Sequence, residues 1–346
     1  MLNKKHHVRV CSVVLTLVVA VTATAKTGSK ARKSDVEITE QATAVLWRNP
    51  DDIRTRNLFF GSGGQAHAPH TAYTFEKEDR EGTSPKFVVH DENGVRWKVK
   101  MGYEARPEIV ASRLVWAVGY ATNEDYFLPE LPVMGMPAHL HRGRQYIEPQ
   151  GIARNVRLKR YLGDEKKVGI WKWRDNPFLD TRELNGLRVM MALLNNWDLK
   201  DDNNAIYREK QTEGLGAENI YMVSDLGASF GSTGLDWTQS LSKGNLRCYS
   251  HSKFISKVTP DYVDFNVPTR ASLIHIFDPP EYVMRLKLRG IGKRVPRNDV
   301  RWVGLLLAHL SPEQIRDAFR AAGYPPEEVE GFSKVVEKRI SDLTRL

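Results

Sequence analysis

The sequence predicts an α+β fold, with a small strand-rich part, one helix after it, and a mainly helical remainder. Three strand candidates precede residue 101, and apolar residues at helical spacing begin near residue 107 and recur in three later segments. Hydrophobic residues make up 41% of the chain and charged residues 27%, a balance that allows a large buried core.

The strand-rich part is predicted from three short segments. Residues 71–76 form one strand candidate, and residues 86–90 and 95–100 form two more. The last two flank Asn93 and Gly94, a pair that favours the tight turn of a β-hairpin. A hairpin over residues 86–100 is therefore expected.

The first helix is predicted to begin near Pro107 and to end at Gly119, since proline suits a first helical turn. Its apolar residues at helical spacing are Ile109, Leu114, Val115 and Val118. The stretch 129–178 is rich in proline, glycine and arginine, and predicts only one strand, over residues 155–158.

Three further helices are predicted downstream. Asp180 and Glu183 resemble a capping box that opens a helix running to Asn195. Another helix opens at Ser311 and stops near Gly323, and the last covers residues 326–343.

The N-terminus has the pattern of an export signal. Basic residues at 4, 5 and 9 precede an apolar run over residues 10–21 that ends in Ala23, Thr24 and Ala25. The run is shorter than the ~20 residues of a spanning helix. We expect cleavage after Ala25 and a periplasmic or extracellular protein without a transmembrane helix; a membrane tether through an uncleaved segment is the alternative.

The remaining chain is divided by composition. Residues 26–50 are polar and predict a disordered linker, followed by a first lobe over 51–150 and a second over 151–346 that ends in the helical pair. Cys248 is the one cysteine left after removal of residues 1–25, so no intramolecular disulfide is expected.

The net charge argues against nucleic acid as a partner. It is +9 for the whole chain and +6 without residues 1–25, which hold three basic and no acidic residues. No stripe of Arg and Lys interleaved with aromatic residues accompanies this modest excess, as it does in nucleic-acid-binding proteins.

The strongest functional signal is a polar run that contains Asp198, Lys200 and Asn203, followed 22 residues after Asn203 by Asp225, Leu226 and Gly227. Phosphoryl transfer needs a carboxylate that orients the nucleophile and oxygen ligands that hold metal ions. The spacing Asp-x-Lys-x-x-Asn resembles the catalytic loop of protein kinases, and Asp-Leu-Gly resembles the Asp-Phe-Gly that follows it.

A kinase also needs a lysine on a strand and a glutamate on the next helix. Lys100 ends a predicted strand and Glu108 starts a predicted helix, so we favour this pair. Lys98, on the same strand face, and Glu104 are the alternatives, and solvated lysines on a strand are the simplest explanation without function.

The turn before the hairpin is a candidate phosphate contact. Gly82, Thr83 and Ser84 have backbone N–H groups that can face a phosphate, and Lys86 adds positive charge. A second glycine-rich segment, residues 61–64, is interpreted as a flexible loop.

Taken in order over residues 71–231, these motifs resemble the atypical kinases: HipA-like kinases, type II phosphatidylinositol 4-kinases and secretory-pathway kinases. The segment Asp225 to Gly231 is similar to the secretory-kinase Asp-Asn-Gly-x-x-Phe-Gly. The resemblance implies a bilobal protein-kinase-like fold with ATP in the cleft and Mg²⁺ or Mn²⁺ held by Asn203 and Asp225. It further implies Asp198 as base or nucleophile-orienting residue, with Lys200 of the same motif, and Lys100 on the phosphates.

Two features depart from the resemblance. Asn196 stands where many kinases have His, and the distance from Asp198 to Asp225 requires an inserted loop, expected over residues 211–217. We therefore keep two hypotheses: an active phosphotransferase, or an exported nucleotide-binding pseudokinase or scaffold. The acceptor, whether protein, lipid headgroup or small molecule, has no readable motif.

Overall fold

Five strands close into a barrel in the order β2-β3-β4-β6-β5. They are β2 (Tyr73–Asp79), β3 (Lys86–Asp91), β4 (Arg96–Lys100), β5 (Asp125–Met134) and β6 (Ile152–Arg160). The expected hairpin is β3 and β4, which pair antiparallel around a turn in which Gly94 has a φ of 76°. The barrel encloses its own hydrophobic core, to which Phe87, Trp97, Val99 and Leu158 contribute.

The computed structural model describes residues 42–70, 72–163, 165–209, 217–232, 243–267 and 279–346. The helices are α1 (Ala105–Ala117), α2 (Arg182–Leu193), α4 (Leu246–His251), α5 (Pro279–Arg289), α6 (Arg297–Leu307), α7 (Pro312–Ala321) and α8 (Pro326–Thr344). The remaining strands are β1 (Thr43–Val45), β7 (Glu165–Gly169), β8 (Asn204–Glu209), β9 (Glu218–Val223), β10 (Ile255–Val258), β11 (Tyr262–Phe265) and β12 (Val295–Pro296). Among these residues, no helix has both the length and the apolar composition needed to span a bilayer.

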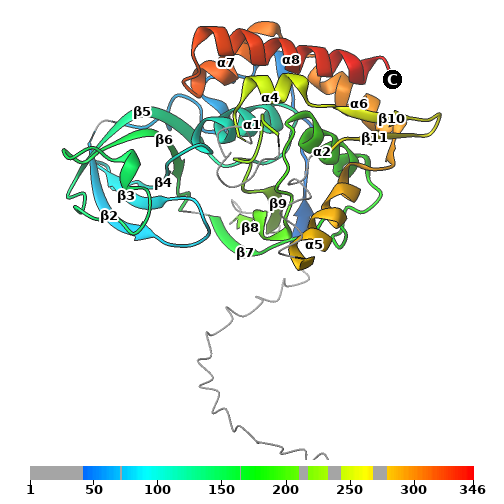
Figure 1. The fold of residues 1–346 in the computed structure, drawn as a ribbon. Helices are drawn as coiled ribbons and strands as arrows, with labels where there is room; N and C mark the ends of the chain where they lie inside the picture. The colour runs from blue at the N-terminus through cyan, green and yellow to red at the C-terminus, as the bar shows by residue number, and fades with distance from the viewer. Residues whose placement is uncertain (1–41, 71, 164, 210–216, 233–242, 268–278) are drawn as a thin grey trace, which may run out of the picture. The chain divides into compact units, whose positions relative to one another are not determined.

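Helix α1 packs against β5 and β6 of the barrel on one side and against α7 on another (Figure 1). Its apolar residues belong to a second hydrophobic core, which it shares with α2, α6, α7 and α8. A helix that contacts both the barrel and the helical part holds a fixed place in the fold, so its polar residues can be positioned accurately.

Two further sheets lie outside the barrel, and the described chain after β6 also contains helices. One has the order β1-β9-β8-β7 and the other β10-β11-β12. Helices cover more of the described residues after β6 than strands do, as expected for a mainly helical second part. The short strands of these sheets were not predicted, because their long-range pairing leaves no strong local pattern in the sequence.

The boundary expected at 150/151 falls just before β6, which pairs with both β4 and β5 and so belongs to the barrel. Helix α2 begins after Thr181, whose Oγ1 accepts a hydrogen bond from the backbone N–H of Leu184 at 3.2 Å. Thr181, and not Asp180, is therefore the capping residue; Asp180 has a positive φ of 64° just before it. The predicted helix start at Ser311 is confirmed for α7, where Ser311 and Gln314 form a capping box.

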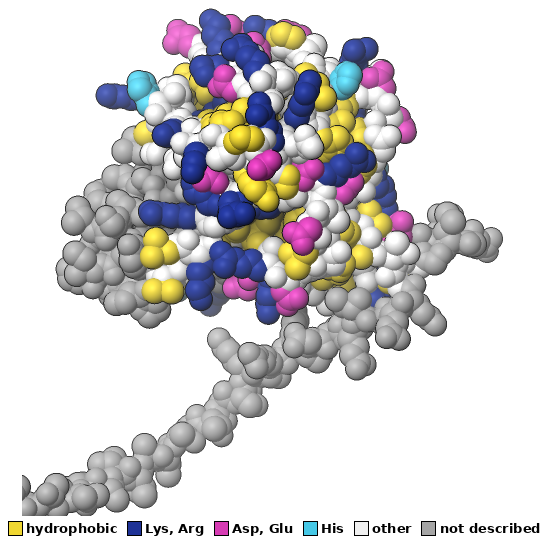
Figure 2. Space-filling view, turned by 90° about the vertical axis from the view of Figure 1, so that its right-hand side faces the viewer, with side chains coloured by type: hydrophobic (Ala, Val, Ile, Leu, Met, Phe, Trp, Pro, Cys, Tyr) yellow, Lys and Arg dark blue, Asp and Glu magenta, His cyan; other side chains and the backbone are white. Residues whose placement is uncertain are grey.

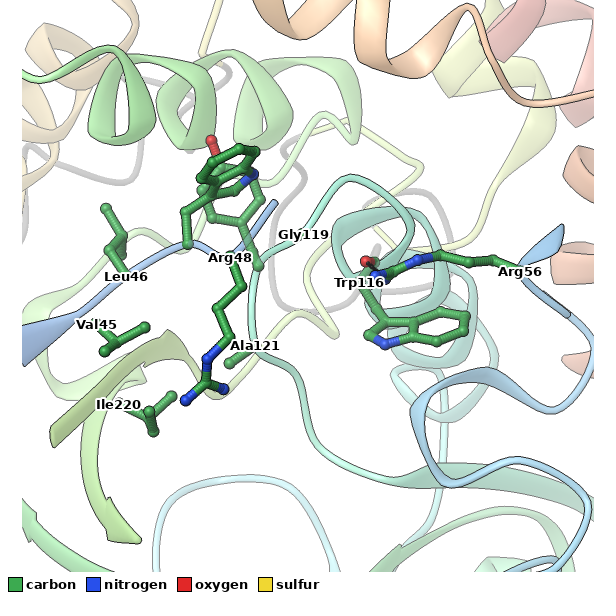
Figure 3. A pocket seen from close by; sticks show the side chains of 10 residues that line it. Val45, Leu46, Arg48, Arg56, Trp116, Gly119, Ala121 and Ile220 are labelled. Carbon is green, nitrogen blue, oxygen red and sulfur yellow. Dashed lines mark hydrogen bonds between the residues drawn. The ribbon is translucent and has the colours of Figure 1, made fainter. Parts of the chain in front are cut away.

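The disordered linker expected over residues 26–50 is wrong for its last part. Residues 43–45 pair in parallel with residues 218–220 of β9, and Leu46 is only 3% exposed. Figure 3 shows Leu46 and Arg48 lining a pocket together with Ile220. Hydrophobic burial thus fixes this segment, while the export signal and residues 26–41 lie outside the described residues.

Candidate functional site

Lys100 is the last residue of β4, and its side chain is only 3% exposed. Its Nζ lies 2.8 Å from Glu108 Oε2 and 3.2 Å from Asp225 Oδ1. The structure therefore brings together the predicted lysine, the predicted glutamate and a predicted metal ligand that lies 125 residues further along the chain.

The structure also places the two alternatives to this pair. Glu104 Oε2 lies 3.0 Å from Lys100 Nζ, so Glu104 joins the cluster beside Glu108. Lys98 instead pairs with Asp79 at 2.8 Å, on the same barrel face but with a different acid.

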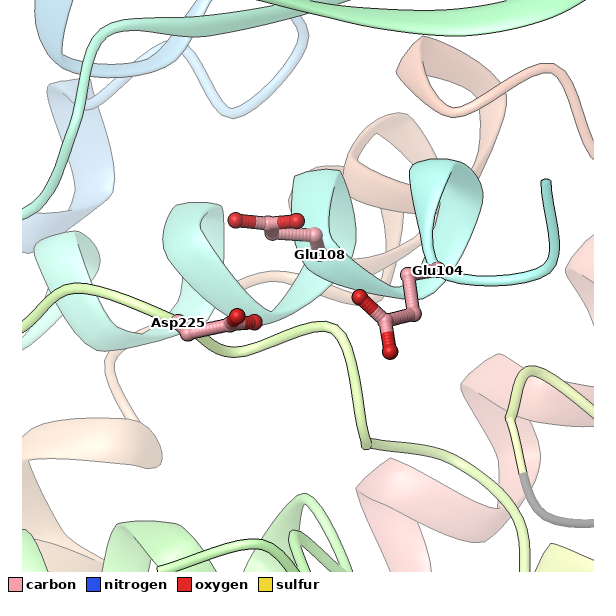
Figure 4. Close-up of side chains that lie close together, drawn as sticks. All are labelled: Glu104, Glu108 and Asp225. Carbon is pink, nitrogen blue, oxygen red and sulfur yellow. The ribbon is translucent and has the colours of Figure 1, made fainter. Parts of the chain in front are cut away.

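Three carboxylates surround the ammonium group of Lys100. Glu104 and Glu108 come from the start of α1, one turn apart, and Asp225 comes from the loop after β9 (Figure 4). Their oxygens lie within 4.8 Å of one another, a spacing that also suits a metal ion. Because Lys100 already contacts all three, its ammonium group is the cation around which this cluster is built.

The strand pairing explains why these charges meet. Lys100 lies between Lys86 of β3 and Arg157 of β6 in register, so the three cations share one face of the sheet. Their neighbours Phe87 and Val99 point into the barrel core, which directs the basic row toward the outer face.

Acidic partners compensate the buried basic row. Arg157 donates to Glu108 Oε1 at 2.7 Å and lies 3.6 Å from Asp125. Burial by itself lowers the pKa of Lys100, but Asp225, Glu108 and Glu104 together raise it above its usual range. Lys86 gains less from these acids, and its pKa is lowered by burial and by the nearby charge of Lys100.

The predicted phosphate turn joins β2 to β3 and reaches the same cluster. Gly82 has a φ of 65°, and Arg142 binds the carbonyl groups of Arg80 and Gly82. Ser84 Oγ donates to Glu104 Oε2 at 2.8 Å. Thr83 is part of the same bend.

The glycine-rich segment at 61–64, expected to be a flexible loop, instead begins with a 3-10 turn packed near Arg113 and Tyr126, which corrects that interpretation.

The loop that contains Asp198 follows α2 and lies against the segment of Asp225. The carbonyl of Asn203 accepts hydrogen bonds from the backbone N–H groups of Ser224 at 2.8 Å and Asp225 at 3.3 Å. The Asn203 amide donates to the Asp198 carbonyl at 2.6 Å, and Lys200 Nζ lies 3.8 Å from Asp198 Oδ1. The two predicted motifs are thus adjacent in space.

The segment after Asp225 is fixed by backbone contacts to α2 and its C-terminal turn. Phe230 has a φ of 57°, and its N–H donates to the Leu194 carbonyl at 2.8 Å. Asn195 donates through its side chain to the Gly231 carbonyl. The strands β8 and β9 lead into and out of the expected insertion at 211–217, of which residues 211–216 lie outside the described residues.

Asn203 and Asp225 fit a metal site by their donor atoms. Asn203 must donate through its amide nitrogen to the Asp198 carbonyl, which turns its amide oxygen away from that bond. Among the described residues, Lys100 and the N–H of Gly227 both bind Oδ1 of Asp225, which leaves Oδ2 as a donor on a side chain that is 41% exposed. Amide and carboxylate oxygens are the ligands that Mg²⁺ and Mn²⁺ prefer.

Sequence reasoning assigned no role to two cations of the site. Lys243 forms an ion pair with Glu104, although 139 residues separate them. Arg157 binds Glu108 from the strand that the sequence predicted only in part. A lone lysine or arginine carries no local signal of a partner so distant, so only the folded chain reveals these contacts.

Lys and Arg side chains are spread over one face of the described chain and alternate there with acidic and hydrophobic ones (Figure 2). The positive net charge is thus mixed with negative charge on this face. The expectation that nucleic acid is not a partner stays a prediction.

No family model matches the chain, and no curated protein matches it. Among solved structures, a Helicobacter pylori proinflammatory kinase, CtkA, is similar over 79% of this chain and 96% of that one, with a TM-score of 0.42 and 11% identity. The Golgi casein kinase is similar over 80% of this chain and 73% of that one, with a TM-score of 0.33 and 11% identity. The structure of the Golgi casein kinase with Mn and ADP bound is similar over 79% of this chain and 73% of that one, with a TM-score of 0.34 and 10% identity. The chain is thus distantly similar to kinases of solved structure, at a level that decides neither its family nor its activity.

Proposed function

We propose that this chain is an ATP- and metal-dependent phosphotransferase of the atypical kinase type. The observation that carries the proposal is the position of Lys100, within 2.8 Å of Glu108 and 3.2 Å of Asp225. A phosphoryl-transfer site needs a cation held ready by a glutamate beside a carboxylate that binds metal. The sequence motifs predict these roles for all three residues independently of the distances between them.

In this proposal, Lys100 binds the phosphates of ATP and Glu108 keeps its ammonium group in place. Backbone N–H groups of Gly82 and Thr83, the hydroxyl of Ser84 and the charge of Lys86 line the same phosphates. Asn203 and Asp225 hold Mg²⁺ or Mn²⁺, which when bound neutralises charge on the phosphate oxygens.

Asp198 acts on the acceptor. Its carboxylate orients the acceptor hydroxyl and accepts its proton, and Lys200, 3.8 Å from Asp198 Oδ1, offsets negative charge beside it. The terminal phosphoryl group of ATP breaks its bond to the oxygen of the β-phosphate, so that ADP is the leaving group, and forms its new bond to the acceptor oxygen. The acceptor is a protein, a lipid headgroup or a small molecule.

A second candidate function is that of a scaffold without turnover, in which nucleotide binding is weak or lost. One observation favours it: the Glu104 carboxylate lies against Ser84 and Lys100, two of the groups that the proposal assigns to phosphate. A carboxylate at this place weakens nucleotide binding, whereas Asp198, Asn203 and Asp225 favour turnover.

ATP consumption by a Lys100→Met variant tests the proposed function. The matched control is Lys98→Met, because Lys98 lies on the same strand face and is also paired with an acid at 2.8 Å. We expect loss of activity by a factor of about 100 or more in Lys100→Met and near-normal activity in Lys98→Met. Equal rates in the two variants, with both folded by circular dichroism, would refute the assignment of Lys100.

Export is part of the proposal and rests on residues 1–25 alone. Expression of the full chain in a bacterium with a periplasm, followed by N-terminal sequencing of the periplasmic fraction, tests it. The expected N-terminus is Lys26; a chain retained with Met1 in the membrane fraction favours the tether.

A further inference from the structure

Glu104 is bound by three donors that come from three separate parts of the chain. Ser84 Oγ lies 2.8 Å and Lys100 Nζ 3.0 Å from Oε2, and Lys243 Nζ pairs with Oε1. Ser84 belongs to the turn after β2, Lys100 to β4, and Lys243 to the segment before α4. Together they form a nest of one hydroxyl and two ammonium groups around a single anion.

The carboxylate of Glu104 is not needed for the helix that carries it. Glu104 is the N-cap residue of α1, yet its side chain makes no capping hydrogen bond. Residues at this position ordinarily accept from the first free N–H groups of the helix. Glu108, one turn later, already holds Lys100 at 2.8 Å, so the lysine does not require Glu104 for its position.

The place of this carboxylate is next to the predicted metal loop. A Cβ atom added at Gly227 would lie 2.7 Å from Cβ and 3.1 Å from Oε2 of Glu104. Gly227 follows Asp225 by two residues and donates its N–H to Asp225 Oδ1 at 3.2 Å. The anion bound by Ser84, Lys100 and Lys243 thus lies within 4.8 Å of a carboxylate oxygen of Asp225, the proposed metal ligand.

Carboxylate and phosphate oxygens accept the same charge-assisted hydrogen bonds, so a site built for one also binds the other. We propose that Ser84, Lys100 and Lys243 form the binding site for one phosphate group of the nucleotide, and that Glu104 occupies this site until the nucleotide displaces it. The inference rests on the proposed function, and it adds Lys243 as a phosphate-binding residue.

Glu104 is charged at neutral pH and therefore competes with an incoming phosphate. Burial by itself raises the pKa of Glu104, but the charges of Lys100 and Lys243, with hydrogen bonds from Lys243 and Ser84, hold it well below its usual range. Displacement requires Glu104 to leave both lysines, and phosphate, with its higher charge and further oxygens, replaces these contacts.

Calorimetric titration with inorganic pyrophosphate, without metal, tests the inference directly. The variants are Glu104→Gln and Lys243→Met. The control is Glu76→Gln, which removes an equivalent carboxylate paired with Arg96 on the outside of the barrel at 2.8 Å. We expect Glu104→Gln to bind pyrophosphate about ten-fold more tightly and Lys243→Met at least about five-fold more weakly than the wild type, because each change alters one charge-assisted contact.

Equal or weaker binding by Glu104→Gln would overturn the inference, since Glu104 would then support the ligand and not compete with it. Unchanged binding by Lys243→Met would also overturn it. If either variant fails to fold by circular dichroism, Ser84→Ala, which removes only one hydroxyl, replaces it and is expected to bind pyrophosphate about three-fold more weakly; unchanged binding by Ser84→Ala counts against the inference.

A second titration, with ADP and Mn²⁺, separates this inference from the proposed function. If neither the wild type nor Glu104→Gln binds ADP, the proposed function fails along with the inference. If the wild type binds ADP in a manner that depends on Asp225, while Glu104→Gln and Lys243→Met bind like the wild type, only the inference fails.

Discussion

Lys100 of β4 and Glu108 of α1 form a fully buried ion pair of 2.8 Å, which joins the barrel to the helix beside it. Arg157 binds the other oxygen of Glu108 at 2.7 Å, so one carboxylate bridges two cations. Burying such charges costs more free energy than the pair returns unless every partner is in place. The cluster therefore indicates a function that needs the charges, and not a contribution to stability alone.

Removal of Asp225 is expected to abolish metal-dependent nucleotide binding. ADP with Mn²⁺ at about 100 times its Kd should raise the melting temperature of the wild type by about 5 °C. Asp225→Ala should lose the part of this rise that depends on Mn²⁺, because Asp225 is a proposed metal ligand and also contacts Lys100. The readout is the melting temperature with ADP, with Mn²⁺ and with both.

Asp79→Asn is the matched control for Asp225, since Asp79 pairs with Lys98 as Asp225 pairs with Lys100. It should keep the full metal-dependent rise. An equal rise in Asp225→Ala and the wild type would remove Asp225 from the metal site.

Removal of Asp198 is expected to stop turnover and leave binding intact. Asp198→Ala removes the group proposed to accept the acceptor's proton, so ATP consumption should fall by about 100-fold or more. Asp202→Ala in the same loop is the control, because Asp202 is exposed and its change should have little effect. Parallel measurement of ADP affinity separates the two effects; turnover that persists in Asp198→Ala points to another base.

The parts of the site that could be predicted are those encoded close together in the sequence. Lys100 and Glu108 are eight residues apart, at the end of a strand and the start of a helix that local patterns predicted. Asp198 and Asn203 lie in one short turn, and Asp225 was linked to them by the resemblance of its motif.

The rest depends on contacts that no local pattern encodes. Strand β5 contains Pro129 and Pro132, which lowered its strand signal, although the barrel pairs it with β6 along most of its length. Strand β1 is only three residues long and is held by a partner far along the chain. Lys243 reaches Glu104 across 139 residues, and the sequence offers no reason to connect them.

The low pKa of Glu104 gives a prediction for stability against pH. Its carboxylate stabilises the fold fully above the ordinary glutamate pKa of about 4.3, and this contribution declines as the pH falls below that value toward the lower folded pKa. The glutamine of Glu104→Gln does not titrate, so the variant lacks this dependence on pH. Below about pH 4, the free energy of unfolding of the wild type should therefore fall more steeply with decreasing pH than that of Glu104→Gln. The difference in slope is up to about 1.4 kcal/mol per pH unit.

Urea unfolding of the wild type and Glu104→Gln at about pH 7, 5, 4 and 3 measures this difference in slope. Glu76→Gln is the control, because Glu76 lies on the surface and its pKa is lowered chiefly by a hydrogen bond from Arg96. Parallel curves for the wild type and Glu104→Gln would show that the lysines do not hold the Glu104 carboxylate in its charged form.

The aromatic cluster behind the Asp225 segment gives a prediction for folding. Phe230 packs against Tyr249 at 5.2 Å, Phe319 at 5.4 Å and Phe332 at 6.0 Å between ring centroids. Phe332 of α8 is fully buried and stacks on Phe319. Phe332→Ala leaves a cavity in this cluster and should lower the free energy of unfolding by about 3–5 kcal/mol.

The same cluster also bears on the site, because Phe230 follows Asp225 by five residues and its N–H is bonded to the end of α2. Phe230→Ala should therefore cost stability and also weaken metal-dependent ADP binding of the folded protein, whereas Phe332→Ala should affect stability far more than affinity. Urea unfolding together with calorimetric titration at a temperature where both variants are folded compares the two. If both variants bind ADP with wild-type affinity, the ring of Phe230 supports the core alone, and the backbone bonds of its segment suffice to position Asp225.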